Sequence, residues 1–243
     1  MKVTAKKNVI LALALMILSC LTSMAQDIVI PNDLTGEARD NYVAAVRGDA
    51  EAQLVMGYCY RMGVGAPRDP SQSLFWYQKA ANQGNVVAIY NLGVCYDEGI
   101  GVTRNMKAAA QYYNTAAQKG DKYAQVSIAN CYFNGEGVPQ NYDKAFKWFE
   151  KAAKQGYAPA QFWMGVCYDD GKGVKQNHKK AVEWYTKAAE QGDAQSQYNL
   201  AVSYLEGEGV KKDEQKAIML LRQAAEQGDT DAKALLQELG VEM

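Results

Sequence analysis

The chain has 243 residues, of which 26 are Lys or Arg and 27 are Asp or Glu, so the formal net charge is −1 at pH 7. This balance gives no reason to expect nucleic acid or an anionic membrane surface as a partner. The single histidine, His178, excludes metal motifs that need paired histidines and would make a histidine-based catalytic relay depend on one residue.

Residues 1–25 have the features of a secretory signal peptide. Lysines at positions 2, 6 and 7 precede an unbroken apolar run of ten residues from Val9 to Leu18. Ser23-Met24-Ala25 then places small residues where a signal peptidase cleaves, so we expect cleavage before Gln26. The sequence thus predicts an exported protein, periplasmic or extracellular.

Two alternatives to a cleaved signal peptide remain open. The first is a short membrane anchor, although ten apolar residues are too few to form a permanent span, and we expect none after cleavage. The second is a lipoprotein anchored at Cys20, because residues 17–20 (Ile-Leu-Ser-Cys) loosely resemble a lipoprotein box. Leu18 is an unusual residue at its position in such a box, and Ser23-Met24-Ala25 offers a better cleavage site.

A lead-in and one helix are expected before the regular part of the chain. Residues 26–34 are predicted to be extended, since Pro31 and Asn32 oppose regular structure. Residues 35–47 are predicted to form an N-terminal capping helix that covers the first unit of a repeat.

From residue 48 onward the chain repeats every 36 residues, which indicates a repeat architecture. One tyrosine recurs at this spacing without exception: Tyr60, Tyr96, Tyr132, Tyr168 and Tyr204. A glycine opens each unit and the C-terminal segment: Gly48, Gly84, Gly120, Gly156, Gly192 and Gly228. Gly-x-Gly pairs and Ala-Ala pairs recur at the same spacing, and an aromatic or Leu-Leu pair precedes each Ala-Ala.

Each unit is predicted to contain two helices. Asp or Asn follows the opening glycine in every unit except the fourth, where Tyr157 stands, and can cap the first helix. The Gly-x-Gly pair is expected to stop that helix, because glycine tolerates the positive φ of a helix end. A second Asp or Asn then caps the second helix, which carries the aromatic and Ala-Ala pairs.

These units are predicted to stack into an all-α solenoid. A single helix pair cannot bury its apolar face alone, so stability must come from neighbouring units. The five units are predicted at 48–83, 84–119, 120–155, 156–191 and 192–227, followed by a C-terminal capping helix within 228–243.

The repeated residues resemble the Sel-one-like repeat (SLR), a branch of the tetratricopeptide-repeat superfamily. The resemblance is clearest at residues 92–102 (LGVCYDEGIGV) and 144–156 (KAFKWFEKAAKQG), and it extends over roughly residues 48–227. It implies a right-handed α/α superhelix that serves as an adaptor or scaffold, and it brings no catalytic residues. The fifth unit departs most, with Ser203 for cysteine and Leu220-Leu221 for the aromatic pair.

Four cysteines, one in each of the first four units, invite a disulfide interpretation in an exported protein: Cys59, Cys95, Cys131 and Cys167. However, equivalent points on stacked helices are about 8–10 Å apart, whereas a disulfide needs Cα atoms within about 7 Å. Cysteine-rich bacterial relatives of the repeat carry a second cysteine in each unit, which this chain lacks. Buried free thiols are therefore expected, and a metal site is not.

No other motif predicts chemistry. The Gly-x-Gly pairs follow helices, whereas a phosphate-binding loop needs a preceding strand. Asp169 and Asp170 begin no calcium loop, because spaced oxygen ligands closing on a glutamate are absent, and we expect a solvated acidic edge there. His178 is expected at the surface beside the helix-capping Asn177. The chain is predicted not to be an enzyme and to need no cofactor.

Positions that vary between units are candidates for recognition, because packing does not fix them. Superhelical repeat proteins use their first helices to line a concave surface that suits peptides or helices. We therefore predict partner-binding residues on the exposed face of the first helices: anchors Tyr58, Met62, Tyr123 and Trp163, with hydrogen-bonding neighbours Asn91, Asn130 and Asn199. For Trp163 the alternative is packing on Phe162 or on the neighbouring unit.

The predicted function is a non-enzymatic scaffold that binds a protein or peptide on its concave face. The alternative is a cell-wall-related or β-lactam-binding or -hydrolysing protein, as the resemblance to cysteine-rich relatives implies. That alternative is weakened by the missing second cysteine and by the lack of an identifiable nucleophile. Nothing in the sequence indicates a particular oligomeric state.

Overall fold

The computed structural model describes residues 28–241, which form twelve α-helices and no strand. A single helix, α2 (Gly36–Val46), precedes five helix pairs, and a single helix, α13 (Thr230–Glu238), follows them. The pairs are α3 (Ala50–Met62) with α4 (Pro70–Asn82), α5 (Val86–Glu98) with α6 (Met106–Gln118), α7 (Lys122–Asn134) with α8 (Tyr142–Lys154), α9 (Ala158–Asp170) with α10 (His178–Ala189), and α11 (Ala194–Glu206) with α12 (Glu214–Glu226). No helix within this part of the chain combines the length and apolar character that a membrane crossing requires.

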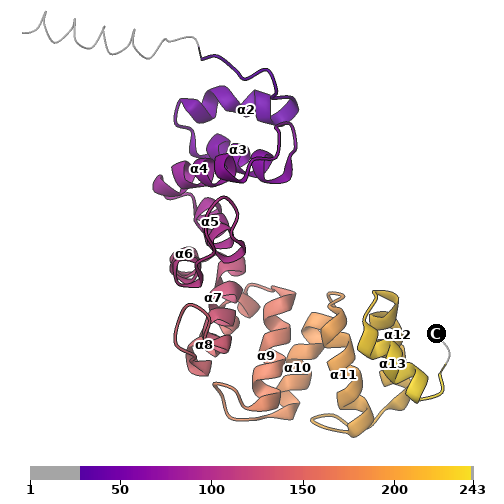
Figure 1. The fold of residues 1–243 in the computed structure, drawn as a ribbon. Helices are drawn as coiled ribbons and strands as arrows, with labels where there is room; N and C mark the ends of the chain where they lie inside the picture. Colours follow the sequence, from indigo (N-terminus) through magenta and orange to yellow (C-terminus); the bar gives the residue numbers. More distant parts are fainter. Residues whose placement is uncertain (1–27, 242–243) are drawn as a thin grey trace, which may run out of the picture.

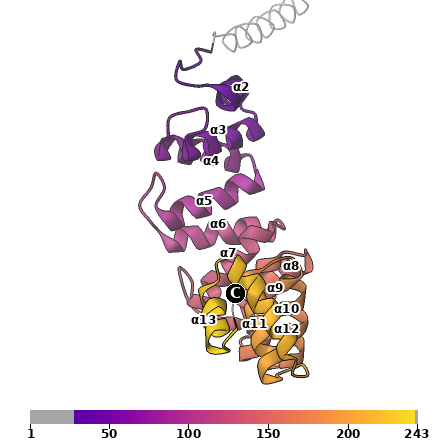
Figure 2. The ribbon, with the colours of Figure 1, turned by 90° about the vertical axis from the view of Figure 1, so that its right-hand side faces the viewer.

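Each helix packs against the one before and the one after it, so the pairs form the predicted solenoid. The path is curved, and α2–α4 and α11–α13 stand at opposite ends of an arch (Figure 1). Seen from the side, α2 to α7 lie one above another and the later helices gather beneath them (Figure 2). The predicted signal peptide, its cleavage site and Cys20 lie outside the described residues.

The helix ends are capped as the repeat predicts. The carboxylate of Asp49 accepts from the backbone N–H of Ala52 at 2.7 Å, and the equivalent Asp or Asn does the same for α5, α7, α11 and α13. Tyr157 makes no side-chain cap at α9. At the other end, Gly63 has φ +73° and its N–H bonds the carbonyl of Cys59, as expected of a helix stop.

The second glycine of each Gly-x-Gly pair has a further role that the sequence did not reveal. A Cβ added to Gly101 would lie 2.2 Å from the carbonyl oxygen of Pro70, which begins the second helix of the preceding unit. The same close contact recurs in the following units, where Gly137 meets Met106, Gly173 meets Tyr142 and Gly209 meets His178. Glycine therefore lets the loop of one unit touch the helix start of the unit before it.

The core is filled by pairs of residues that change together between units. Mid-helix Gly57 faces Tyr77, and a Cβ at Gly57 would lie 2.4 Å from that ring. Gly93 and Gly165 face Tyr113 and Tyr185 in the same way. The other two units have alanine at this position of the first helix, and their second helices bury Phe149 and Leu221 instead of tyrosine. Small and large residues thus compensate within each unit.

Glutamine pairs connect the two ends of a unit, and the first glutamine of each pair also bonds to the helix that precedes the unit. Gln53 donates to the carbonyl of Ala45 at 2.9 Å, and Gln83 donates to Gln53 Oε1 at 2.8 Å. The same pairing recurs between Gln155 and Gln125, between Gln191 and Gln161, and between Gln227 and Gln197. The second unit has Ile89 and Lys119 at these two positions, so both partners are absent together.

The four described cysteines are buried and free. Burial raises the pKa of Cys95 to about 11 and that of Cys167 to about 12. Thiols held protonated in this way are poor nucleophiles, so these cysteines serve packing.

Candidate partner-binding surfaces

Exposed apolar side chains gather on the first helices of the first three units. Tyr58 and Met62 of α3 are 48% and 54% exposed, Val87 of α5 is 48% exposed, and Tyr123 of α7 is 46% exposed. About half of the surface of each of these large apolar side chains is therefore left outside the core. Together with Asn91 of α5 these four residues define what we call the first-helix face.

A cavity of about 290 Å³ opens on this face between α3 and α5. It is lined by Leu54, Val55 and Tyr58 of α3, by Val87 and Asn91 of α5, and by Glu37 of α2. Two of the predicted site residues, Tyr58 and Asn91, therefore meet at one hollow. Its walls are mainly apolar, with one amide and one carboxylate at the edge, which is the usual make-up of a small binding pocket.

Asn91 is held in place by its neighbours. Its amide nitrogen donates to the carbonyl of Val87 at 2.9 Å, and its amide oxygen accepts from Arg61 at 3.2 Å. Tyr123 is also supported from below, with its ring 5.2 Å from the ring of Tyr157 and 6.1 Å from that of Tyr90. Both side chains are therefore ordered in the absence of a partner, which reduces the entropy lost on binding.

Trp163 is packed more deeply than the other predicted anchors. Its ring stacks on Phe149 with centroids 5.3 Å apart and an interplanar angle of 8°, and it also contacts Phe133 at 5.0 Å. Phe162 of its own helix lies 5.5 Å away. The alternative for Trp163 was packing on Phe162 or on the neighbouring unit, and the structure contains both kinds of contact. A role for Trp163 as a binding anchor stays a prediction.

The remaining predicted residues lie further along the chain. Asn130 of α7 is half-buried, and its amide oxygen has no hydrogen-bond partner within the described structure. Asn199 of α11 is half-buried and hydrogen-bonds Tyr185. Neither residue lines the cavity between α3 and α5.

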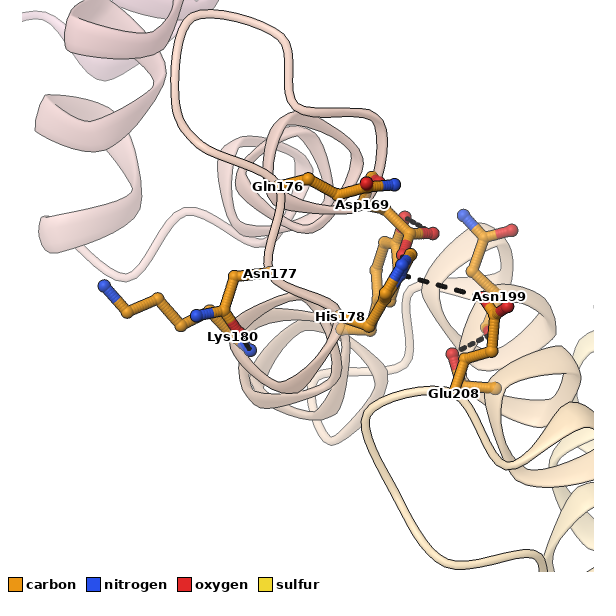
Figure 3. Close-up of polar contacts among 9 residues, drawn as sticks. Asp169, Gln176, Asn177, His178, Lys180, Asn199 and Glu208 are labelled. Carbon is orange, nitrogen blue, oxygen red and sulfur yellow. Dashed lines mark hydrogen bonds and ion pairs between the residues drawn. The ribbon is translucent and has the colours of Figure 1, made fainter.

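His178, expected at the surface, has a side chain that is 37% exposed and that belongs to a polar cluster (Figure 3). Its Nδ1 lies 2.7 Å from Oδ1 of Asp169 and 3.7 Å from Oε2 of Glu208, which belongs to the next unit. The hydroxyl of Tyr185 approaches the other carboxylate oxygen of Asp169 at 3.5 Å. Asp169 is therefore a paired carboxylate at a partly exposed position, with its side chain 35% exposed, because it bonds to the histidine and to the buried phenol.

Within the described residues, the contacts of this cluster offer no activated nucleophile. The hydrogen bond to Asp169 raises the pKa of His178 above its ordinary value. However, the only hydroxyl on the carboxylate belongs to Tyr185, whose pKa is raised well above its usual range, first by burial and then by Asp169. A phenol that stays protonated is a poor nucleophile. Within residues 28–241, no group of three His, Cys, Asp or Glu side chains could hold a metal ion.

A larger cavity, of about 590 Å³, lies in the first unit among α2, α3 and α4. We call it the second-helix pocket and define it by Tyr42, Tyr60, Phe75 and Trp76, with Asp33 and Asp69 beside them. Trp76 has edge-to-face contacts with Tyr42 at 6.2 Å and with Phe75 at 5.2 Å. Variation among the first helices gives no indication of this pocket, because the pocket lies beside a second helix. Phe75, one of its lining residues, is 47% exposed.

The same position in the last unit holds a smaller cavity, of about 440 Å³. Adding 144, which is four times the repeat length, to Tyr42, Tyr60, Phe75 and Trp76 gives Thr186, Tyr204, Met219 and Leu220, and all four line this cavity. The two cavities are thus equivalent in position and differ in the residues that line them.

Comparison with known proteins places this architecture in a family. The Sel1 repeat model matches residues 50–85, 86–121, 122–157, 158–193 and 194–229, each range starting two residues after the units given above. No curated protein matches at the level of significant similarity.

Solved structures include clear relatives. The crystal structure of a protective antigen present in uropathogenic Escherichia coli strains, which displays an SLR fold, is 36% identical with a TM-score of 0.77 over 85% of this chain. That match spans 46% of the antigen, so the chain corresponds to about half of its length. A Sel1 repeat protein from Oxalobacter formigenes is 30% identical with a TM-score of 0.75, covering 84% of this chain and 88% of its own.

A sel1 repeat protein from Klebsiella pneumoniae shares the fold at 19% identity, with a TM-score of 0.53 over 84% of this chain and 99% of its own. The five matched repeats, the helix pairs and the two more similar structures agree. The chain belongs to the Sel1 repeat family.

Proposed function

We propose that this chain is a non-enzymatic scaffold whose first-helix face, on the concave side of the superhelix, holds a segment of another protein. Sel1 repeat proteins are generally protein-interaction scaffolds. The observation that supports this face is the gathering of Tyr58, Met62, Val87 and Tyr123 on three successive first helices, beside the cavity between α3 and α5. Aromatic side chains at such positions are the usual centres of binding energy in protein interfaces.

The shape and chemistry of the face favour an apolar segment with some polar groups. An apolar side chain of the partner would enter the cavity between Leu54, Tyr58 and Val87. Asn91, which is fixed by Arg61, would stand at the edge to meet a polar group of the partner. Amphipathic helices that lie in grooves present such spaced apolar anchors.

The test is quantitative affinity capture from an envelope extract of the source organism, with the bound proteins identified by mass spectrometry. The bait is the full mature chain, either wild type or carrying Tyr58→Ser, Val87→Ser and Tyr123→Ser together. These three side chains are about half exposed, so the triple variant should fold. We expect at least one protein captured by the wild type to fall about tenfold or more in the triple variant.

A matched control carries Val64→Ser and Met219→Ser, which remove similarly exposed apolar side chains that lie outside both the first-helix face and the second-helix pocket. This control should retain the same protein. Equal capture by the wild type and the triple variant would overturn the proposal. So would loss of the protein in both variants, because that result would reflect general surface stickiness.

No observation favours the β-lactam-binding alternative. Within the described residues, the cysteines are buried with raised pKa values, and the phenol beside His178 is held protonated. A nitrocefin turnover assay on the purified chain should give the rate of buffer alone. Turnover that follows the protein through purification would overturn the non-enzymatic assignment.

Export is part of the same proposal. It is supported by the lysines at positions 2, 6 and 7, by the apolar run of residues 9–18 and by Ser23-Met24-Ala25. Intact mass measurement of the protein from its native host should give a chain that begins at Gln26. A chain that begins at Cys20 with added lipid mass would instead establish the lipoprotein alternative.

A further inference from the structure

In the last three units, the repeated tyrosine of the first helix is covered by a lysine of the same unit. The ammonium nitrogen of Lys144 lies 5.0 Å from the ring centre of Tyr132, that of Lys180 lies 5.0 Å from Tyr168, and that of Lys216 lies 5.5 Å from Tyr204. The three lysines are equivalent by the 36-residue repeat. A cation over the electron-rich face of an aromatic ring is a favourable arrangement.

The first two units lack this lysine, and their repeated tyrosines have different surroundings. In the second unit the equivalent residue is Ala108, and Tyr96 is instead stacked on Tyr112, with centroids 5.4 Å apart and an interplanar angle of 15°. In the first unit the equivalent residue is Gln72, and Tyr60 lines the second-helix pocket of about 590 Å³. The first unit therefore keeps the repeated tyrosine, Tyr60, beside an open pocket, but it lacks the lysine that covers this tyrosine in the last three units.

The second-helix pocket also has more aromatic rings than its counterpart in the last unit. Tyr42, Phe75 and Trp76 stand where the last unit has Thr186, Met219 and Leu220. Aromatic rings set edge to face around a pocket form the cages that recognise ammonium groups in other proteins.

Charge adds a second, independent indication. Asp33 and Asp69 line the pocket, and the Asp33 carboxylate has no ion pair or hydrogen bond within residues 28–241. Both carboxylates contribute, after burial, to a pKa of Tyr60 above its ordinary value, so their negative charge acts at this ring. Lys79 is the lysine that lines the pocket, and its ammonium lies 5.4 Å from the centre of the Phe75 ring.

We propose that the second-helix pocket binds the side chain of a lysine from a partner protein, whose ammonium takes the place that Lys144, Lys180 and Lys216 take in the later units. The site rests on the proposed role in protein binding, since its ligand is a protein side chain. It adds a contact on the second helices that is separate from the first-helix face.

Lysine fits this site better than arginine. The three occupied sites of the same chain all use lysine, with ammonium-to-ring distances of 5.0 to 5.5 Å. A compact ammonium on a flexible stem can enter between rings set edge to face, whereas a planar guanidinium binds best when it stacks parallel to one ring face.

The test uses three blocked tripeptides with central lysine, norleucine or arginine: acetyl-Ala-Lys-Ala-amide and its two analogues. The chain has four tryptophans, so the indole N–H region of a ¹⁵N-correlated NMR spectrum holds four signals. The signal of Trp76 is assigned from its loss in Trp76→Phe. We expect it to shift saturably with the lysine peptide, while Trp148, Trp163 and Trp184 do not move. Norleucine keeps the length and removes the charge, and should bind about tenfold more weakly.

Two variants add a lysine at equivalent positions of different units. Gln72→Lys gives the first unit its own cation, and we expect it to abolish the shift of Trp76 by the lysine peptide. Ala108→Lys makes the same change of net charge in the second unit and should leave that shift intact. Asp33→Asn should weaken binding several-fold. Melting temperatures of all variants identify any that fail to fold.

The proposal is overturned if the lysine peptide produces no saturable shift of Trp76, if norleucine or arginine binds as well as lysine, or if Gln72→Lys binds as the wild type does. The titration needs no partner on the first-helix face. Its failure therefore leaves the scaffold proposal standing, and failure of the capture experiment leaves this site to be judged by the titration.

Discussion

The first and last units have the same backbone plan and different surfaces. In both, a capped first helix ends at a Gly-x-Gly pair, and a cavity lies beside the second helix at the same repeat position. In the last unit Lys216 covers Tyr204 and the surrounding residues are mostly aliphatic or polar. In the first unit the lysine is missing and three further aromatic side chains face the space.

This contrast shows how a repeat divides its residues between two tasks. Glycines, caps and the small-to-large core pairs recur because every unit must stack on its neighbours. Residues outside that set, such as Tyr58, Gln72 and Phe75, can change without loss of the stack. We therefore propose that binding capacity follows from departures from the repeat, and exchanging residues between units tests whether the division holds.

The largest effect is expected where a core pair is broken. Gly165→Ala would place a Cβ 2.3 Å from the ring of Tyr185, so we expect a loss of about 2 kcal/mol in the free energy of unfolding. Adding Tyr185→Leu copies the alanine–leucine pair of the last unit. The double variant should lose less stability than the sum of the two single variants, as measured by urea unfolding. Additive losses would contradict the compensation that we describe.

A smaller effect is expected at the glutamine pairs. Gln53→Ile removes the bonds to Ala45 and Gln83, both 2.9 Å or shorter, and should cost about 1 kcal/mol. Adding Gln83→Lys copies the second unit, where Ile89 and Lys119 occur together. The double variant should unfold at the same urea concentration as the single variant or higher. A further large loss would show that the two positions do not act as a pair.

Exchanging the cation between the last and first units should change stability less. Lys216→Gln removes the ammonium over Tyr204 and should cost about 0.5–1 kcal/mol, whereas Gln72→Lys should add a similar amount in the first unit. Melting temperatures of the two variants should therefore move in opposite directions. A shift in the same direction for both would mean that the cavities are not equivalent.

The smallest effect concerns pH. Because the pKa of His178 is raised in the folded chain by Asp169, its contribution to stability is fully present below the unfolded value of about 6.5 and is lost as pH rises through the folded value. His178→Asn should remove this dependence between pH 6 and 8. The check is urea unfolding at several pH values, and an unchanged slope in the variant would assign the dependence to other groups.

The sequence was sufficient to predict the fold because each structural signal is local and repeated. Asp49 caps its helix and Gly63 stops it, and among the ten helices of the repeat units only α9, at Tyr157, lacks a side-chain cap, as the pattern indicates. The surroundings of Trp163 and His178 were not predictable in the same way. They depend on Phe133 and Phe149 of the preceding unit and on Glu208 of the next, so contacts between units decide them.

The candidate surfaces were predictable only in part. Variation among first helices indicated Tyr58 and Asn91, which line one cavity. The second-helix pocket could not be predicted in this way, because it depends on a contact between α2 and α4, such as that of Tyr42 with Trp76. No single sequence motif indicates this contact. The sequence feature that marks this pocket is Gln72, which stands where the last three units have a lysine. This difference can be interpreted only because the structure places those lysines over their tyrosines.

Hydrogen–deuterium exchange on the chain, with and without the protein recovered by affinity capture, tests the central claim most directly. We expect bound partner to slow exchange in α3, α5 and α7, whose side chains form the first-helix face, and to leave α9 to α12 unchanged. Protection confined to α9–α12, or a bound complex with no protection in α3, α5 or α7, would contradict the claim that the departures of the first three units make the binding surface.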